Sequence, residues 1–277
     1  MSQEFINTST GEIVEIAMYR TPQQMEIGRK VKHTKIVNNQ SKRDFECMAG
    51  RNFSFFKQSY IKQYLSSMND TYLKAFGAVI VLSSYLPMDG TNKLPFKTMD
   101  DFAKALKLSR VNATENVKLA QELNLIYKIG NDYMLNDDVI FRGKNGNVTE
   151  TVKAYHKTIN AVAESMSMVE IGFLFLILPF ISFDNHVVCH NPEASKLEDI
   201  VGMSLTELAA ITNMNKSTIS RKFKSMTFTM EGITMAVFSY FKNPVSGKQL
   251  IVVNPALFVR STSDSWRDLV KLFVISR

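Results

Sequence analysis

The sequence predicts a mainly helical α+β protein with small β elements, organised as two tandem copies of one unit. Two observations lead to this prediction. The 277 residues are 45% hydrophobic and 21% charged, which is enough apolar material for one large domain or two ordinary ones. The chain also repeats itself, because residues 98–120 align without a gap on residues 204–226 and their apolar positions match.

The repeat continues on both sides of these segments. Upstream, Gly77 aligns with Gly172 inside two apolar stretches, and downstream Asn136 aligns with Asn254. The offset between the copies grows from 95 residues at the glycines to 118 residues at the asparagines. The insertions fall between matched elements, where loops tolerate extra length. Three aligned blocks in the same order argue for a duplicated unit rather than for a chance likeness between helices.

Each copy reads as helix, turn, helix, corner, helix and then two strands around a loop. In the second copy Ser204 is the expected N-cap of the helix before the corner, and Met214 at the corner is expected to point inward. Ile219, Phe223 and Met226 then recur at i, i+4 and i+7. This spacing predicts a second helix that buries one apolar stripe.

Two strand-like segments follow that helix. Residues 234–241 and 249–255 alternate or run apolar, and the loop of residues 242–248 between them holds Pro, Gly and two lysines. A helix-corner-helix with such a hairpin behind it is a winged helix-turn-helix, and the predicted fold has two of them in tandem. The predicted domains are a basic N-terminal arm with a lead-in helix (1–67), the first winged unit (68–147), a linker helix with the second winged unit (148–262) and a C-terminal amphipathic helix (263–277).

The second helix of the pair in the second copy has the chemistry of a DNA-reading element. Short hydroxyls near its start suit phosphates and base edges, Arg221 can make a fork to guanine, and lysines can neutralise phosphates. The alternative interpretation is an ordinary solvated polar face of a helix. The residues predicted to contact DNA in this copy are Lys216, Ser217, Thr218, Ser220, Arg221 and Lys224 on the helix, and Lys242 and Lys248 on the wing.

The matching helix of the first copy is a weaker candidate. Glu115 occupies the place of Arg221, and a carboxylate that faces the groove is unhelpful unless it accepts a hydrogen bond from cytosine. This copy reads different bases, touches only phosphates or serves as a scaffold. Its candidate DNA-binding residues are Ser109, Arg110, Asn112, Thr114 and Lys118.

A family resemblance supports this interpretation. Residues 108–144, "LSRVNATENVKLAQELNLIYKIGNDYMLNDDVIFRGK", resemble the winged-helix core of the replication protein L family from small plasmids of Gram-positive bacteria, where the last strand reads roughly "YMINPxxFxKG". The opening "INTSTGEIVE" is similar to openings in that family and in related phage regulators. The chain departs from the family by carrying two copies, as does the other large class of plasmid initiators. The resemblance implies a plasmid or phage replication initiator or transcription regulator that binds specific double-stranded DNA.

Composition and missing motifs bound the other functions. A net charge of +7 favours a polyanionic partner. Two cysteines and no secretory signal favour the cytoplasm, and the apolar run of residues 168–183 is too short to span a membrane. No catalytic constellation is visible, and the segment "HVVCH" (186–190) lacks a second cluster to complete a zinc site, so neither an enzyme nor a cofactor is expected. The rival function is a protein-protein interaction module with non-specific nucleic-acid affinity.

The flanking segments carry three further expectations. Residues 20–57 are rich in Lys and Arg and predict a basic arm along the DNA backbone, with a solvated surface as the alternative. Residues 55–68 and 149–166 resemble helices that lead into each copy. At the C-terminus an apolar helical stripe packs on its own domain or, alternatively, forms a homodimer. That stripe consists of Trp266, Leu269, Val270 and Phe273.

Overall fold

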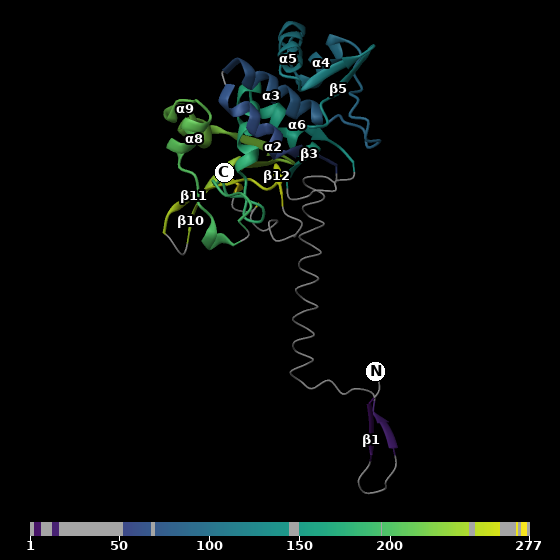
Figure 1. Ribbon diagram of the computed structural model, residues 1–277, viewed down its shortest axis with the longest axis vertical. Helices are drawn as coiled ribbons and strands as arrows, with labels where there is room; N and C mark the ends of the chain where they lie inside the picture. The colour runs from purple at the N-terminus through teal and green to yellow at the C-terminus, as the bar shows by residue number, and fades with distance from the viewer. Residues whose placement is uncertain are drawn as a thin grey trace. The chain divides into compact units, whose positions relative to one another are not determined.

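The chain forms two compact units in the computed structural model, residues 1–43 and residues 44–277, and the second unit is a mixed α+β structure (Figure 1). In the first unit β1 (Gln3–Ile6) and β2 (Ile13–Ile16) form an antiparallel hairpin. The structure describes residues 3–6, 13–16, 52–67, 70–143, 150–194, 196–243, 247–260, 270 and 273–275.

The first copy has the order of elements that the sequence predicts. Helix α3 (Asp70–Ser83) is followed by α4 (Met99–Leu106) and, after a corner, by α5 (Arg110–Glu122). The three helices pack against one another. The antiparallel hairpin of β4 (Ile126–Ile129) and β5 (Asp132–Leu135) then completes the copy.

The second copy repeats this order. Helix α7 (Met168–Ile177) corresponds to α3, while α8 (Leu205–Ile211) and α9 (Lys216–Ser225) form the pair around the corner. The hairpin consists of β10 (Phe238–Lys242) and β11 (Gln249–Val253). The apolar stripe of α9 is buried as predicted. Two short 3-10 helices, η2 (178–180) and η3 (197–199), lie between α7 and α8.

Matching residues start and close the matching elements. Thr98 and Ser204 each form a capping box, with Asp101 and Glu207 respectively, so α4 and α8 begin in the same way. Asn136 donates its side-chain amide to the carbonyl of Asn124 at 2.8 Å, and Asn254 donates to the carbonyl of Ala236 at 2.9 Å. The aligned asparagines therefore tie the end of each hairpin to the segment that precedes it.

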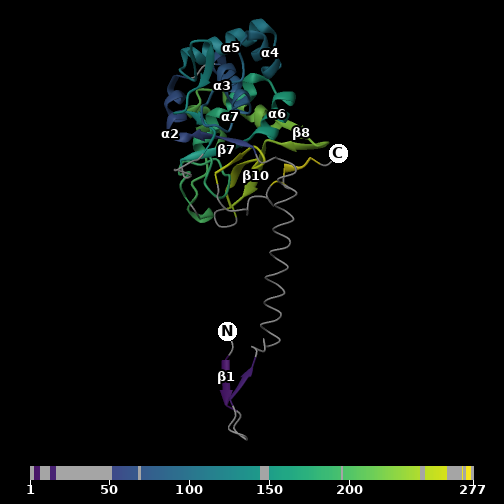
Figure 2. The same ribbon diagram turned by 90° about the vertical axis from the view of Figure 1, so that its right-hand side faces the viewer.

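One hairpin has no counterpart in the first copy and was not predicted. Strands β8 (Thr227–Met230) and β9 (Ile233–Ala236) pair across a two-residue turn of Glu231 and Gly232, both with positive φ. The hairpin packs on helix α6 (His156–Ser165), beside which it lies in Figure 2. The predicted strand of residues 234–241 is therefore divided into the end of β9 and most of β10.

Each lead-in segment is a strand followed by a helix, so the prediction of helices there holds only for the later residues of each segment. Strand β3 (Phe53–Lys57) precedes the short helix α2 (Gln58–Ile61) and η1 (62–67), and β7 (Thr151–Tyr155) precedes α6. The two strands pair antiparallel with each other, and β6 (Ile140–Phe141) and β12 (Phe258–Val259) flank them in the order β12-β7-β3-β6. Each strand finds its partner far away along the chain, so local spacing did not reveal the sheet.

The register of this sheet is the same in both copies. Phe55 of β3 lies opposite Phe141 of β6, and their counterparts Lys153 of β7 and Val259 of β12 also lie opposite each other. Phe55 and Lys153 are themselves paired at the centre of the sheet. This reciprocal pairing is what an isologous two-fold interface produces, here within one chain.

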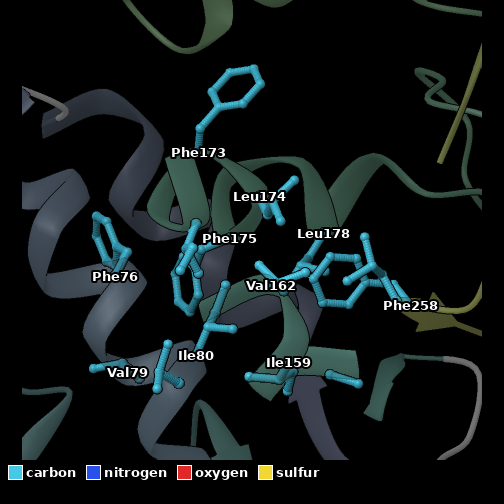
Figure 3. Packing of buried hydrophobic residues seen from close by; sticks show 14 of the residues in the cluster. Phe76, Val79, Ile80, Ile159, Val162, Phe173, Leu174, Phe175, Leu178 and Phe258 are labelled. Atoms are coloured by element: carbon cyan, nitrogen blue, oxygen red, sulfur yellow. The ribbon is translucent and has the colours of Figure 1, made fainter. Parts of the chain in front are cut away.

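Helices α3 and α7 pack closely against each other at their aligned glycines. A side chain added at Gly77 would collide with the backbone oxygen of Met168, and one added at Gly172 would collide with the backbone oxygen of Leu73. The aligned glycines thus let the two backbones touch. Beside them the rings of Phe76 and Phe175 stack with centroids 4.6 Å apart, as seen between the two helices in Figure 3.

A pair of aligned arginines anchors the strand that ends each copy. Arg142 donates to the carbonyl of Leu86, and Arg260, which is fully buried, donates to the carbonyls of Ile181 and Pro192 at 2.8 and 3.0 Å. Each guanidinium group therefore contacts the segment that follows the first helix of its own copy. They are structural residues that the sequence did not single out.

The C-terminal segment is described only in part. Val270 and Phe273 are buried, while Trp266 and Leu269 of the same predicted stripe lie outside the described residues. Val274 is in an antiparallel bridge with Met235 of β9, so the chain is extended where the predicted helix would continue.

Candidate functional site

The residues predicted to contact DNA in the second copy lie on α9 and on the hairpin β10–β11. Burial of Ile219 and Phe223 turns the opposite side of α9 outward. Lys242 and Lys248 are exposed near the two ends of the hairpin turn. On α9, Lys216, Ser217, Arg221 and Lys224 are exposed, and Thr218 and Ser220 are half-buried.

The outward side of α9 forms a shallow depression of about 420 Å³. The N-cap Asn215 orients its first turn, because its side-chain oxygen accepts from the backbone N–H of Ser217 at 2.9 Å and from its hydroxyl at 2.7 Å. Arg221 lies one turn further along the same side. The depression is lined by Ser217, Ser220, Arg221, Lys224 and Ser225.

A second, larger hollow lies between α9, the start of α8 and the hairpin. We call it the wing cleft; its volume is about 540 Å³. Tyr240 and Gln249, which contribute to it, were not predicted as site residues. Strand alternation could have found them, because Tyr240 pairs with Ile251 and Gln249 lies two residues before that residue, on the same face. The wing cleft is lined by Met203, Ser204, Leu205, Thr206, Lys216, Ser220, Lys224, Tyr240, Gln249 and Ile251.

The electrostatics of this surface are one-sided. Among the described residues, no carboxylate forms an ion pair with Lys216, Arg221 or Lys224. The nearby Glu207 carboxylate is hydrogen-bonded to the hydroxyl and backbone N–H of Ser204 and to His190, which lowers its pKa to about 2. Glu207 does not line either hollow. The surface of α9 and the wing cleft therefore present positive charge to any ligand.

The first copy places its candidate residues on the equivalent helix, α5, but with a different charge pattern. Ser109 is the N-cap of α5, and the Thr114 hydroxyl donates to the carbonyl of Arg110 at 2.8 Å. The Arg110 guanidinium lies 3.6 Å from the Asp100 carboxylate. All five predicted residues, Ser109, Arg110, Asn112, Thr114 and Lys118, are exposed, and so is Glu115.

Carboxylates also occupy the hairpin side of the first copy. Asp132 at the start of β5 binds both Lys93, at 2.6 Å, and Lys97. Hydrogen bonds from these two lysines lower the pKa of Asp132. Asp132 therefore offsets part of the positive charge on this side of the first copy.

The predicted basic arm has one basic residue in the described part of the chain. Lys57 is described, and it lies 3.7 Å from Asp138 and over the ring of Phe141, so it contributes to the central sheet. The remaining basic residues of this arm lie outside the described part of the chain: Arg20, Arg29, Lys30, Lys32, Lys35, Lys42, Arg43 and Arg51.

No protein-family model matches the chain, and neither a curated protein nor a solved structure matches it. Among the described helices, none is both long and apolar enough to cross a bilayer. The apolar run that begins at Met168 forms the ten-residue helix α7, whose side chains are mostly buried in the core. The prediction of a core helix for this run is confirmed.

Proposed function

We propose that the chain contains two tandem winged helix-turn-helix units and binds specific double-stranded DNA through the second. The proposal is supported by the order of elements, because each copy has three helices and a two-stranded hairpin, with the additional hairpin β8–β9 between α9 and β10 in the second copy. In such units the second helix of the pair enters the major groove, which is about 12 Å wide and accepts one α-helix. Helix α9 and the hairpin β10–β11 have these positions in the second copy.

The observation that carries the proposal is the exposed face of α9. It offers hydroxyls at its start and cations along its length, without a carboxylate in its lining. Ser217 stands at the helix N-terminus, where the backbone favours an anionic phosphate. Arg221, one turn further, has the planar fork that pairs with the two acceptors of guanine. Lys216 and Lys224 supply charge for phosphates, which fix position rather than sequence.

The resemblance to plasmid replication proteins and phage regulators suggests the biological setting. We propose a transcription regulator or a replication initiator of a plasmid or phage, with the first unit as a scaffold or a weaker DNA contact. The central sheet and the packing of α3 on α7 join the two copies. A DNA contact by the first copy would therefore be made by the same molecule as the contact by the second copy.

Selection from random-sequence duplexes at about 0.15 M salt tests this proposal. The wild-type protein should enrich one motif. Arg221→Ala should weaken binding to that motif by about 1–3 kcal/mol and relax its preference at one position. Lys222→Ala is the matched control, because it removes a charge from the same helix at a residue that lines neither hollow. It should weaken binding slightly and equally for all sequences.

Two outcomes distinguish the alternatives. Weak binding without enrichment, unchanged by Arg221→Ala, would reject sequence-specific reading and favour the protein-interaction module with only non-specific nucleic-acid affinity. If a motif is enriched, its location in the source replicon, at an origin or at promoters, separates an initiator from a regulator.

A further inference from the structure

The wing cleft contains polar side chains that base reading by α9 does not use. Tyr240 and Gln249 project from the hairpin on the face that meets α9, and Lys242 lies opposite Gln249 in the strand register. The Tyr240 phenol is protonated at neutral pH, so its hydroxyl is available as a donor, and partial burial raises its pKa further. The cleft therefore gathers hydrogen-bond donors from the hairpin and cations from the helix.

The two hollows lie on adjoining sides of α9. Lys216, Ser220 and Lys224 recur every fourth residue and line the wing cleft, and Ser220 and Lys224 also border the outward depression, which Ser217 and Arg221 line without reaching the cleft. A helix that lies in the major groove needs both kinds of side, one for base edges and one for the sugar-phosphate strand beside the groove.

The first copy provides an internal comparison for this cleft. Thr206, in the lining of the cleft, aligns with Asp100, and Lys216 aligns with Arg110. In the first copy the aspartate lies 3.6 Å from the arginine and forms an exposed ion pair with it. In the second copy the uncharged Thr206 leaves the cation at this position without that carboxylate. The exchange of one residue therefore makes this position more positive in the second copy.

We propose that the wing cleft holds a backbone phosphodiester of the DNA strand that flanks the groove occupied by α9. Lys216 and Lys224 supply the charge, and Tyr240 and Gln249 donate hydrogen bonds from the hairpin. This inference rests on the proposed function and adds a role that is independent of sequence. The cleft sets how α9 is seated in the groove, while Ser217 and Arg221 read the bases.

The main test variant gives the second copy the residue that the first copy has at the aligned position. Thr206→Asp places a carboxylate beside Lys216, and an acidic residue in the first turn of α8 is compatible with the helix because the helix dipole favours it there. Thr206→Asn is the matched neutral control. We expect Thr206→Asp to weaken duplex binding about tenfold for every sequence and to reduce the salt slope by about one unit, as loss of one phosphate contact requires. Thr206→Asn should bind like the wild type.

A second pair of variants tests the hairpin. Tyr240→Phe removes only a hydroxyl from the cleft, and Tyr127→Phe removes a hydroxyl from an exposed position on the hairpin of the first copy. We expect binding about threefold weaker for Tyr240→Phe, with unchanged motif preference, and no change for Tyr127→Phe. Thermal unfolding of each variant checks that the fold is kept.

The outcomes separate this inference from the proposed function. If the wild type enriches a motif but Thr206→Asp and Thr206→Asn bind alike, the phosphodiester site is wrong and the DNA-binding function stands. If the wild type binds no duplex, both are wrong. Binding of inorganic phosphate as tightly as duplex, abolished by Thr206→Asp, would overturn the backbone assignment in favour of a free phosphate ligand.

Discussion

Helices α5 and α9 occupy the same position in the two copies but differ in net charge. The segment from Met99 to Glu122 contains four basic and four acidic residues, whereas the segment from Leu205 to Ser225 contains four basic residues and one acidic residue. Both helices follow a corner, begin at a side-chain N-cap and bury one side. The comparison teaches that the two copies share the position of this helix, while the exposed residues decide which charge that position presents.

The residues shared by the copies are those that build the fold. The capping boxes, the hairpin asparagines, the crossing glycines and the anchoring arginines Arg142 and Arg260 recur at aligned positions. Several of the residues that differ are exposed, such as Glu115 against Arg221 and Asp100 against Thr206. Three substitutions break or sharpen this division, and they follow in order of expected effect.

The largest effect is expected at the helix crossing. Gly172→Ala should lower the free energy of unfolding by about 3 kcal/mol, because the new methyl group would collide with the backbone of Leu73 and push α3 and α7 apart. Helix propensity alone predicts the opposite sign, since Ala is favoured over Gly inside helices by about 1 kcal/mol. Denaturant unfolding measures the difference. Gly77→Ala should match it, and a stabilised variant at either position would reject the close crossing.

A smaller effect is expected where the copies differ beneath the sheet. Gln58 donates directly to the carbonyl of Leu178, whereas its counterpart His156 is hydrogen-bonded to Ser54, whose hydroxyl donates to the carbonyl of Ser83. Burial, and secondarily the charge of Arg142, lowers the pKa of His156 to about 4. The unfolded chain therefore takes up a proton below pH 6.5 that the folded chain refuses until about pH 4, so stability falls as the pH is lowered through this window.

His156→Gln should remove this dependence. Between pH 7 and pH 5 the wild type should lose about 2 kcal/mol more than the variant, measured by denaturant unfolding at both values. Gln58→His is the reverse exchange and should steepen the dependence. Equal losses in the wild type and His156→Gln would show that this imidazole is not held neutral by its surroundings.

The smallest effect concerns DNA binding by the first copy. Glu115→Arg gives α5 the residue that α9 has at the aligned position, and it should strengthen duplex binding by about 1 kcal/mol if α5 faces the DNA. Glu115→Gln, which only removes the negative charge, should give a smaller gain. Titration of labelled duplex at two salt concentrations measures both. If neither variant binds duplex more tightly than the wild type, the first copy serves only as a scaffold.

Much of the helical structure of residues 44–277 could be predicted from the sequence. The repeat predicted the order of elements, Ser204 was recognised as an N-cap, and the stripe of Ile219, Phe223 and Met226 is buried. These features depend on neighbours within two turns of helix, which leave a periodic pattern. The central sheet depends on strands of two to five residues that pair across the chain, and the segment with Phe55 was therefore read as helix.

The candidate site was predicted only in outline for a similar reason. The helix residues Lys216, Arg221 and Lys224 were found because they share one polar face. Strand alternation places Tyr240 and Gln249 on one face of the hairpin, but only folding of the hairpin against α9 brings that face to the helix residues. The role of Arg260 was missed because a buried, hydrogen-bonded guanidinium looks like any other basic residue in a sequence.

The reciprocal crossing at Gly77 and Gly172 has an evolutionary consequence. In a dimer of identical subunits every substitution appears twice, so a change that improves one half of the assembly is imposed on the other. Joining both halves in one polypeptide removes that constraint. Each half can then change its exposed residues independently, while the pair of touching glycines constrains both halves in the same way.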